Sequence, residues 1–189
     1  EILYLSRCPD VINAQEGFFD VESVWPKLEQ ALRQAISNLV AMRETEGSNI
    51  YGDFIKRADL IAEKLAVIEE RSPQVVEEYQ TRLSDRINEL LAKHNQVIEP
   101  ERLLQEVAIF ADRTSITEEI VRLKSHIKQF RLIIDADQPV GRKLDFLIQE
   151  FNREANTIAS KANDYTLAQV VVEIKAEIEK IREQIQNIE

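Results

Sequence analysis

Apolar side chains recur at spacings of three and four residues along almost the whole chain, and few residues interrupt the pattern. Only four glycines and five prolines occur among 189 residues. Because glycine and proline mark turns and break helices, their scarcity leaves room for few connections between elements. The strict alternation of apolar and polar residues that is typical of half-buried strands is almost absent. The sequence therefore predicts an all-α fold built from a few long helices.

Three regions can be distinguished along the chain. Residues 1–19 hold the only short extended-looking stretch, and we interpret them as the tail of an N-terminal domain that is otherwise missing. Residues 20–98 predict a long antiparallel helical hairpin. Residues 99–189 predict a C-terminal helical bundle, and this bundle carries the candidate site described below.

Local signals predict where the helices begin and end. The apolar spacing continues through Gly47, so a single helix is expected there. Ser72-Pro73 instead predicts a break, because proline favours the first turn of a new helix. The helices of the C-terminal region are expected to begin near Pro100, after a capping box at Ser115–Glu118, near position 140 and near Thr166.

The charge of the chain is strongly negative but unevenly distributed. A net charge of −10 and a pI of about 4.9 exclude a surface that attracts nucleic acid non-specifically. Between Arg122 and Arg153, however, seven lysines and arginines accompany only four acidic residues. This local positive excess is either a random fluctuation or a patch where a polyanion binds.

Several classes of protein are excluded by motifs that the sequence lacks. The single cysteine, Cys8, leaves no internal disulfide framework and no paired-cysteine metal site. No run of about 18 apolar residues occurs, so no membrane-spanning helix is expected. Glycine-rich nucleotide-binding loops, the HExxH zinc motif and the GxSxG nucleophile motif are also absent. An enzyme with this sequence would have to work with carboxylates, arginines, amides and histidine.

The helix expected at 140–163 has an unusual polar side. It carries several asparagine, threonine and serine residues, which are poor helix formers, and it places Glu150 and Glu154 one turn apart, where like charges repel. Amides and guanidinium groups suit phosphate oxygens and base edges, and two such carboxylates can share a divalent cation. The other interpretation is a polar seam in which Glu150 pairs with Arg153 and Glu154 pairs with Lys161.

The preceding helix offers a second group of polar side chains. Glu119, Arg122 and His126 fall at positions i, i+3 and i+7, at the edge of its apolar face. Histidine is well placed to transfer protons near neutral pH, a nearby carboxylate would orient it, and an arginine could hold a phosphate. A lone histidine at a core edge can equally serve packing or capping alone.

Five stretches of the sequence resemble the YicC/YloC family of endoribonucleases. They are MRETEG (42–47), ADRTSITEEI (111–120), RLKSHIKQF (122–130), PVGRKLDFLIQEFNREANTIASKAND (139–164) and IREQIQNIE (181–189). The resemblance covers essentially the whole chain, although the strand-rich N-terminal domain of the family is expected to be absent. It implies a metal-dependent endoribonuclease of the cytoplasm that cleaves single-stranded or structured RNA. It also implies a ring-like homo-oligomer, for which a hexamer is expected.

The resemblance and the polar helix together lead to an assignment of roles. Glu150 and Glu154 are expected to hold a divalent ion, Mn²⁺ or Mg²⁺. Four residues are expected to act in catalysis, the histidine as general acid or base and the arginines as phosphate clamps: His126, Glu119, Arg122 and Arg153. Contacts with RNA are expected from Lys124, Arg142, Lys143, Gln149, Asn152, Asn156 and Lys161.

A non-enzymatic helical scaffold or adaptor is the alternative function. Its long amphipathic helices would oligomerise or bind partner helices, and the acidic net charge and the lack of a strong catalytic motif favour it. The relative placement of the helices expected at 116–134 and 140–163 distinguishes an endoribonuclease from a scaffold. The endoribonuclease requires that His126 and either Glu150 or Arg153 face the same cleft.

Overall fold

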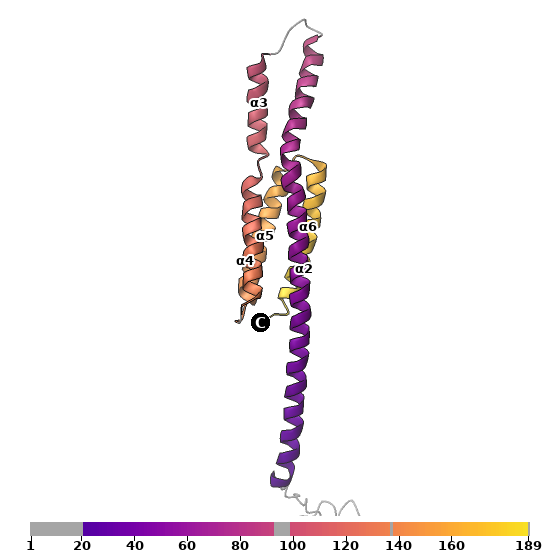
Figure 1. The fold of residues 1–189 in the computed structure, drawn as a ribbon, viewed down its shortest axis with the longest axis vertical. Helices are drawn as coiled ribbons and strands as arrows, with labels where there is room; N and C mark the ends of the chain where they lie inside the picture. The colour runs from indigo at the N-terminus through magenta and orange to yellow at the C-terminus, as the bar shows by residue number, and fades with distance from the viewer. Residues whose placement is uncertain (1–20, 93–98, 137, 189) are drawn as a thin grey trace, which may run out of the picture. The chain divides into compact units, whose positions relative to one another are not determined.

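Every regular element that the structure describes is an α-helix. The computed structural model describes residues 21–92, 99–136 and 138–188, and the interpretation of residues 1–19 falls outside them. The helices are α2 (Val21–Ala92), α3 (Pro100–Arg113), α4 (Thr117–Ile134), α5 (Gly141–Lys161) and α6 (Tyr165–Ile185) (Figure 1). The predicted all-α class is confirmed.

Helix α2 is continuous over 72 residues. It passes through Gly47 as predicted, but the break predicted at Ser72-Pro73 is wrong. An interior proline removes one backbone hydrogen bond and costs about 3 kcal/mol. Ile68 and Val75, one on each side of the proline, are nevertheless both buried in the same core, and this packing offsets the local cost. The described part of region 20–98 is therefore one helix rather than two.

The chain divides into two compact units, Glu1–Gly47 and Ser48–Glu189. In the described part of the first unit, α2 leaves many large apolar side chains about half exposed. They are Val24, Trp25, Leu28, Leu32, Ile36, Leu39, Val40 and Met42. None of the helices in the described ranges is long and apolar enough to cross a membrane.

The core of the second unit joins α2, α4, α5 and α6. Helix α4 packs against α5, and α5 packs against α6. The ring of Phe130 on α4 lies between those of Phe54 on α2 and Phe151 on α5, with centroid distances of 5.4 and 6.0 Å. Apolar residues at helical spacing on α4 and α5 are buried here, among them Ile120, Leu123, Ile127, Leu144, Leu147, Ile148 and Ile158. This packing determines which polar faces of α4 and α5 meet.

Asp164 holds the start of α6 in place. Its Oδ1 accepts a hydrogen bond from the backbone N–H of Leu167 at 2.9 Å, and its Oδ2 accepts one from Arg71 on α2, also at 2.9 Å. Replacing Asp164 by alanine removes both bonds, and we expect a loss of about 1–2 kcal/mol in unfolding free energy. Urea denaturation followed by circular dichroism measures this loss.

The same contacts make this part of the stability depend on pH. The hydrogen bond from Arg71, opposed in part by burial, lowers the pKa of Asp164 below its ordinary value. The stabilisation is therefore fully present above the unfolded pKa, and it is lost as the pH falls through the folded pKa. Asp164→Asn keeps a capping side chain but no charge, so its stability should approach that of the wild type only in acid. If the difference in unfolding free energy between the wild type and Asp164→Asn does not change with pH, the lowered pKa of Asp164 does not contribute to stability.

Candidate functional site

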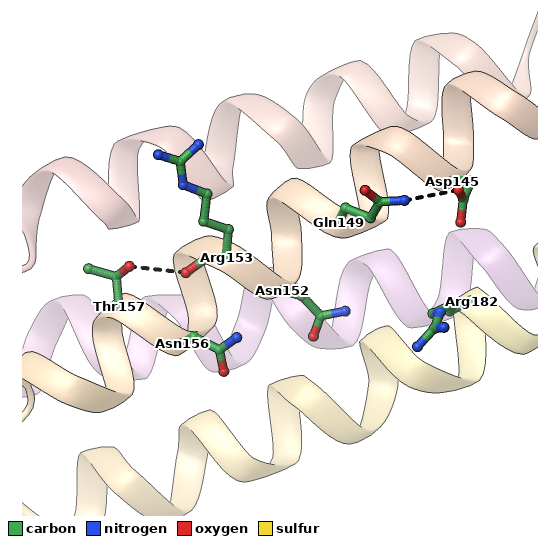
Figure 2. Close-up of a pocket in the computed structure, with 7 residues that line it drawn as sticks. All are labelled: Asp145, Gln149, Asn152, Arg153, Asn156, Thr157 and Arg182. Atoms are coloured by element: carbon green, nitrogen blue, oxygen red, sulfur yellow. Dashed lines mark hydrogen bonds between the residues drawn. The ribbon is translucent and has the colours of Figure 1, made fainter.

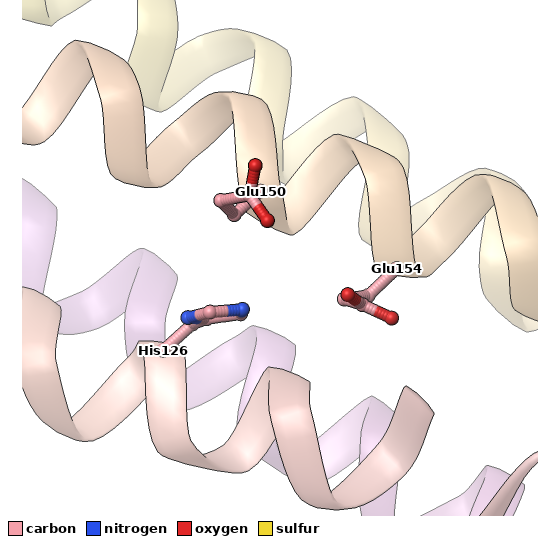
Figure 3. A group of neighbouring side chains, drawn as sticks. All are labelled: His126, Glu150 and Glu154. Carbon is pink, nitrogen blue, oxygen red and sulfur yellow. The ribbon is translucent and has the colours of Figure 1, made fainter. Parts of the chain in front are cut away.

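His126, Glu150 and Glu154 come together where α4 packs against α5. The two glutamates lie one turn apart on α5 and face the histidine on α4 (Figure 3). One nitrogen or oxygen atom from each side chain can be chosen so that all three atoms lie within 4.8 Å of one another. His126 and Glu150 therefore face each other, as a catalytic site at this position requires. We call these three residues the α4–α5 cluster.

The burial of Glu154 places a carboxylate away from water inside the cluster. Its relative exposure is only 3%, and Nη1 of Arg122 lies 3.6 Å from its Oε1. Glu150 has Nη1 of Arg153 at the same distance, 3.6 Å. Both separations exceed normal hydrogen-bond lengths, so each arginine compensates its carboxylate only in part. Two carboxylates at such close range favour further positive charge between them.

His126 brings a polar atom that lacks a hydrogen-bond partner. Its Nδ1 atom is buried and has no hydrogen bond, and its ring lies 6.3 Å from the core ring of Phe151. A buried polar atom without a partner is uncommon and calls for an explanation such as an ion or a water molecule. Two carboxylates and one imidazole at this spacing are a donor set that fits a divalent cation. The mixed set suits Mn²⁺ better than Mg²⁺, which prefers oxygen ligands.

The two predicted arginine clamps border the cluster from opposite helices. Arg122 on α4 forms an ion pair with Glu118 and donates a hydrogen bond to it. This hydrogen bond raises the pKa of the Arg122 guanidinium group above its ordinary value. Arg153 on α5 is largely exposed. Both arginines border the cluster, and their side chains are 49% and 68% exposed, respectively.

Glu119 lies apart from His126. They are seven positions apart on α4, which corresponds to a rise of about 10 Å along the helix. Glu119 is buried and accepts a hydrogen bond of 2.8 Å from Lys161 on α5. Burial tends to raise the pKa of Glu119, but the bond from Lys161 and a backbone hydrogen bond outweigh it and lower the pKa. Glu119 is therefore an ionised partner of Lys161 rather than an orienting partner of His126.

Two predicted RNA contacts are engaged in ion pairs within the protein. Lys161 binds Glu119 and also donates a hydrogen bond of 3.1 Å to the carbonyl of Ser115, so the seam pairing expected between Glu154 and Lys161 is wrong. Lys124 pairs with Glu69 of α2 at 2.5 Å. The structure does not bring either lysine into the α4–α5 cluster.

The amide side chains line a separate groove on the other side of α5. The groove contains Asp145, Gln149, Asn152, Arg153, Asn156, Thr157 and Arg182 (Figure 2). In Figure 2, Asn152 and Asn156 extend toward α6, whereas the Arg153 side chain extends toward α4. Gln149 already donates a hydrogen bond of 3.0 Å to Asp145. Arg153 therefore borders both the amide groove and the cluster.

A second hollow opens directly beside the cluster. It is lined by His126, Gln129, Ile133, Arg142, Lys143, Phe146, Leu147 and Glu150. Arg142 and Lys143, both predicted to contact RNA, thus share one hollow with two cluster residues. The sequence interpretation missed Phe146, which is 65% exposed. The available signal was its position on the helical wheel, opposite the apolar arc formed by Leu144, Leu147 and Ile148.

Comparisons with known proteins cover the whole chain. Residues 68–189 match the family described as "Endoribonuclease YicC-like, C-terminal", and residues 1–52 match "Endoribonuclease YicC-like, N-terminal region". The second match corrects the expectation that the N-terminal domain is absent, because sequence belonging to that region is present.

Two curated relatives carry the name "Probable endoribonuclease YicC". The protein from Clostridioides difficile (strain 630) is 48% identical over 188 residues, which cover 100% of this chain and 64% of that protein. The protein from Haemophilus influenzae (strain ATCC 51907 / DSM 11121 / KW20 / Rd) is 37% identical over 183 residues, covering 97% of this chain and 62% of its own length. The chain thus spans a little under two thirds of each of these relatives.

Proposed function

The chain belongs to the family of YicC-like endoribonucleases, and on this premise we propose that it cleaves RNA at the α4–α5 cluster with the help of a divalent cation. The observation that carries the proposal is the meeting of His126, Glu150 and Glu154 within 4.8 Å. The names of the relatives support an RNA substrate.

In the proposed mechanism, the cluster residues hold the cation. Glu150 and Glu154 supply oxygen ligands and His126 a nitrogen ligand, so we assign His126 to the ligand set in place of its expected role as general acid or base. The cation, when bound, supplies positive charge against the phosphate oxygens on which negative charge develops. Of the two cations expected from the sequence, Mn²⁺ suits this donor set better than Mg²⁺, which prefers oxygen ligands.

The basic residues around the cluster position the RNA backbone. Arg122 and Arg153 flank the cluster and bind the phosphate that is cleaved, because a guanidinium fork matches two phosphate oxygens. Arg142 and Lys143 bind a neighbouring phosphate from the adjoining hollow. These four basic residues supply the positive charge with which an acidic protein would attract RNA at one place.

The scaffold alternative receives less support from the geometry. A pure scaffold has no need for two carboxylates, an imidazole and two arginines around one point. The exposed apolar side chains of α2 are the observation that favours partner binding, and they are compatible with the predicted homo-oligomer. The hexameric state, the cytoplasmic location and the preferred RNA structure stay predictions.

Removal of divalent cations should abolish cleavage by the full-length protein. We expect a labelled single-stranded RNA to remain intact in EDTA and to be cut again after Mn²⁺ is added, more slowly with Mg²⁺. Gel electrophoresis of the fragments measures the rate, and isothermal titration calorimetry measures Mn²⁺ binding without RNA. Cleavage that proceeds unchanged in EDTA overturns the cation requirement, and no cleavage under any condition overturns the proposed activity.

A further inference from the structure

Phe146 is an exposed aromatic ring in an unusual place. It belongs to α5, is 65% exposed and lines the hollow that contains His126 and Glu150. The other phenylalanines of the α4–α5 contact, Phe130 and Phe151, are fully buried. Scattered exposed apolar residues are common on protein surfaces and by themselves mean little. The neighbours of Phe146 distinguish it from the other exposed apolar residues.

The hollow around Phe146 combines three kinds of binding group. Arg142 and Lys143 supply positive charge for a phosphate, and Gln129 supplies an amide for a base edge. Phe146 supplies a flat apolar face. Proteins that bind single-stranded nucleic acid combine an aromatic ring for stacking with positive charge for the backbone. Base-paired nucleotides are already stacked, so a duplex offers no free base to such a ring.

We propose that Phe146 is a stacking platform for one unpaired nucleobase that lies next to the phosphate at the α4–α5 cluster. This inference rests on the proposed function and assigns to Phe146 the recognition of an unpaired nucleotide beside the cleavage site. The ring determines which RNA is positioned, while the cluster and its arginines act on the phosphate. Phe146 is thus a specificity-determining residue outside the set predicted from the sequence.

Binding in EDTA tests the inference without cleavage. A short single-stranded RNA that contains 2-aminopurine loses fluorescence when the base stacks on an aromatic ring. For the full-length protein we expect quenching with the single strand and none with the matching duplex. Phe146→Ala should weaken binding about tenfold and abolish the quenching, while Phe146→Trp should preserve both. Val172→Ala, a change at another exposed apolar residue, on α6, should bind as the wild type does.

The outcomes separate this inference from the proposed function. If Phe146→Ala binds the single-stranded RNA and quenches its 2-aminopurine fluorescence as the wild type does, the stacking role is overturned, even if the wild type cleaves RNA. The stacking role is also overturned if Val172→Ala weakens RNA binding as much as Phe146→Ala does. A loss of binding and quenching in Phe146→Trp, with unchanged helicity, overturns it as well. Quenching that depends on Phe146 in a protein that never cleaves RNA supports the stacking role and rejects only the nuclease activity.

Discussion

Replacing Glu154 by glutamine is expected to lower the rate of RNA cleavage by more than about a hundredfold. Glutamine has nearly the same shape, so the packing between α4 and α5 is preserved. The change removes one negative charge and one strong ligand from the α4–α5 cluster, where Glu154 is only 3% exposed. Initial rates with the full-length protein and a labelled RNA measure the effect on cleavage. Calorimetry should show a parallel loss of Mn²⁺ affinity.

A matched substitution on the surface provides the control. Glu173 on α6 forms an exposed ion pair with Lys64, and exposed ion pairs contribute about 0–1 kcal/mol to stability. Glu173→Gln should therefore leave both cleavage and Mn²⁺ affinity within a factor of two or so of the wild type. If Glu154→Gln cleaves RNA and binds Mn²⁺ like this control, Glu154 has no part in the site.

Replacing Phe151 by alanine is expected to have the largest effect on stability, a loss of about 3–5 kcal/mol in unfolding free energy. The ring is fully buried and lies 6.0 Å from that of Phe130 and 6.3 Å from that of His126. Its removal opens a cavity directly beneath the cluster. Chemical denaturation followed by circular dichroism measures the loss.

Phe146→Ala is the natural comparison, because it makes the same change on the exposed side of the same helix. It should alter the unfolding free energy by no more than about 0.5 kcal/mol. Phe151→Leu, which keeps most of the apolar volume, should cost less than Phe151→Ala. A loss below about 1 kcal/mol in Phe151→Ala would show that the α4–α5 contact does not depend on this ring.

The helices and their buried faces could be predicted because they follow from spacing alone. Positions such as Leu123, Phe130 and Phe151 recur at helical intervals, and each is fully buried. The prediction of a break at Ser72-Pro73 failed because the cost of an interior proline, a few kcal/mol, was outweighed by packing of the helix on both sides of it. That packing depends on contacts with distant helices, which a local rule does not see.

The candidate site was predictable by residue type but not by pairing. His126, Glu150 and Glu154 were all selected from the sequence, and the structure brings them together. The predicted partner of Lys161, Glu154, was wrong, because Lys161 pairs with Glu119 on α4. That pairing depends on how far α4 is shifted along α5, and core packing determines the shift. The amide residues and the acidic residues were treated as one polar side, although they face opposite sides of α5. Their functional roles stay predictions.

The buried carboxylate of Glu154 has a consequence for heat resistance. An ionised group held away from water weakens the folded state, and a cation bound only in that state returns the lost stability by mass action. The melting temperature should accordingly rise with the concentration of Mn²⁺, and it should continue to rise with the logarithm of that concentration after the site is filled. Thermal denaturation would then report the binding of Mn²⁺ to the folded protein, with no substrate needed.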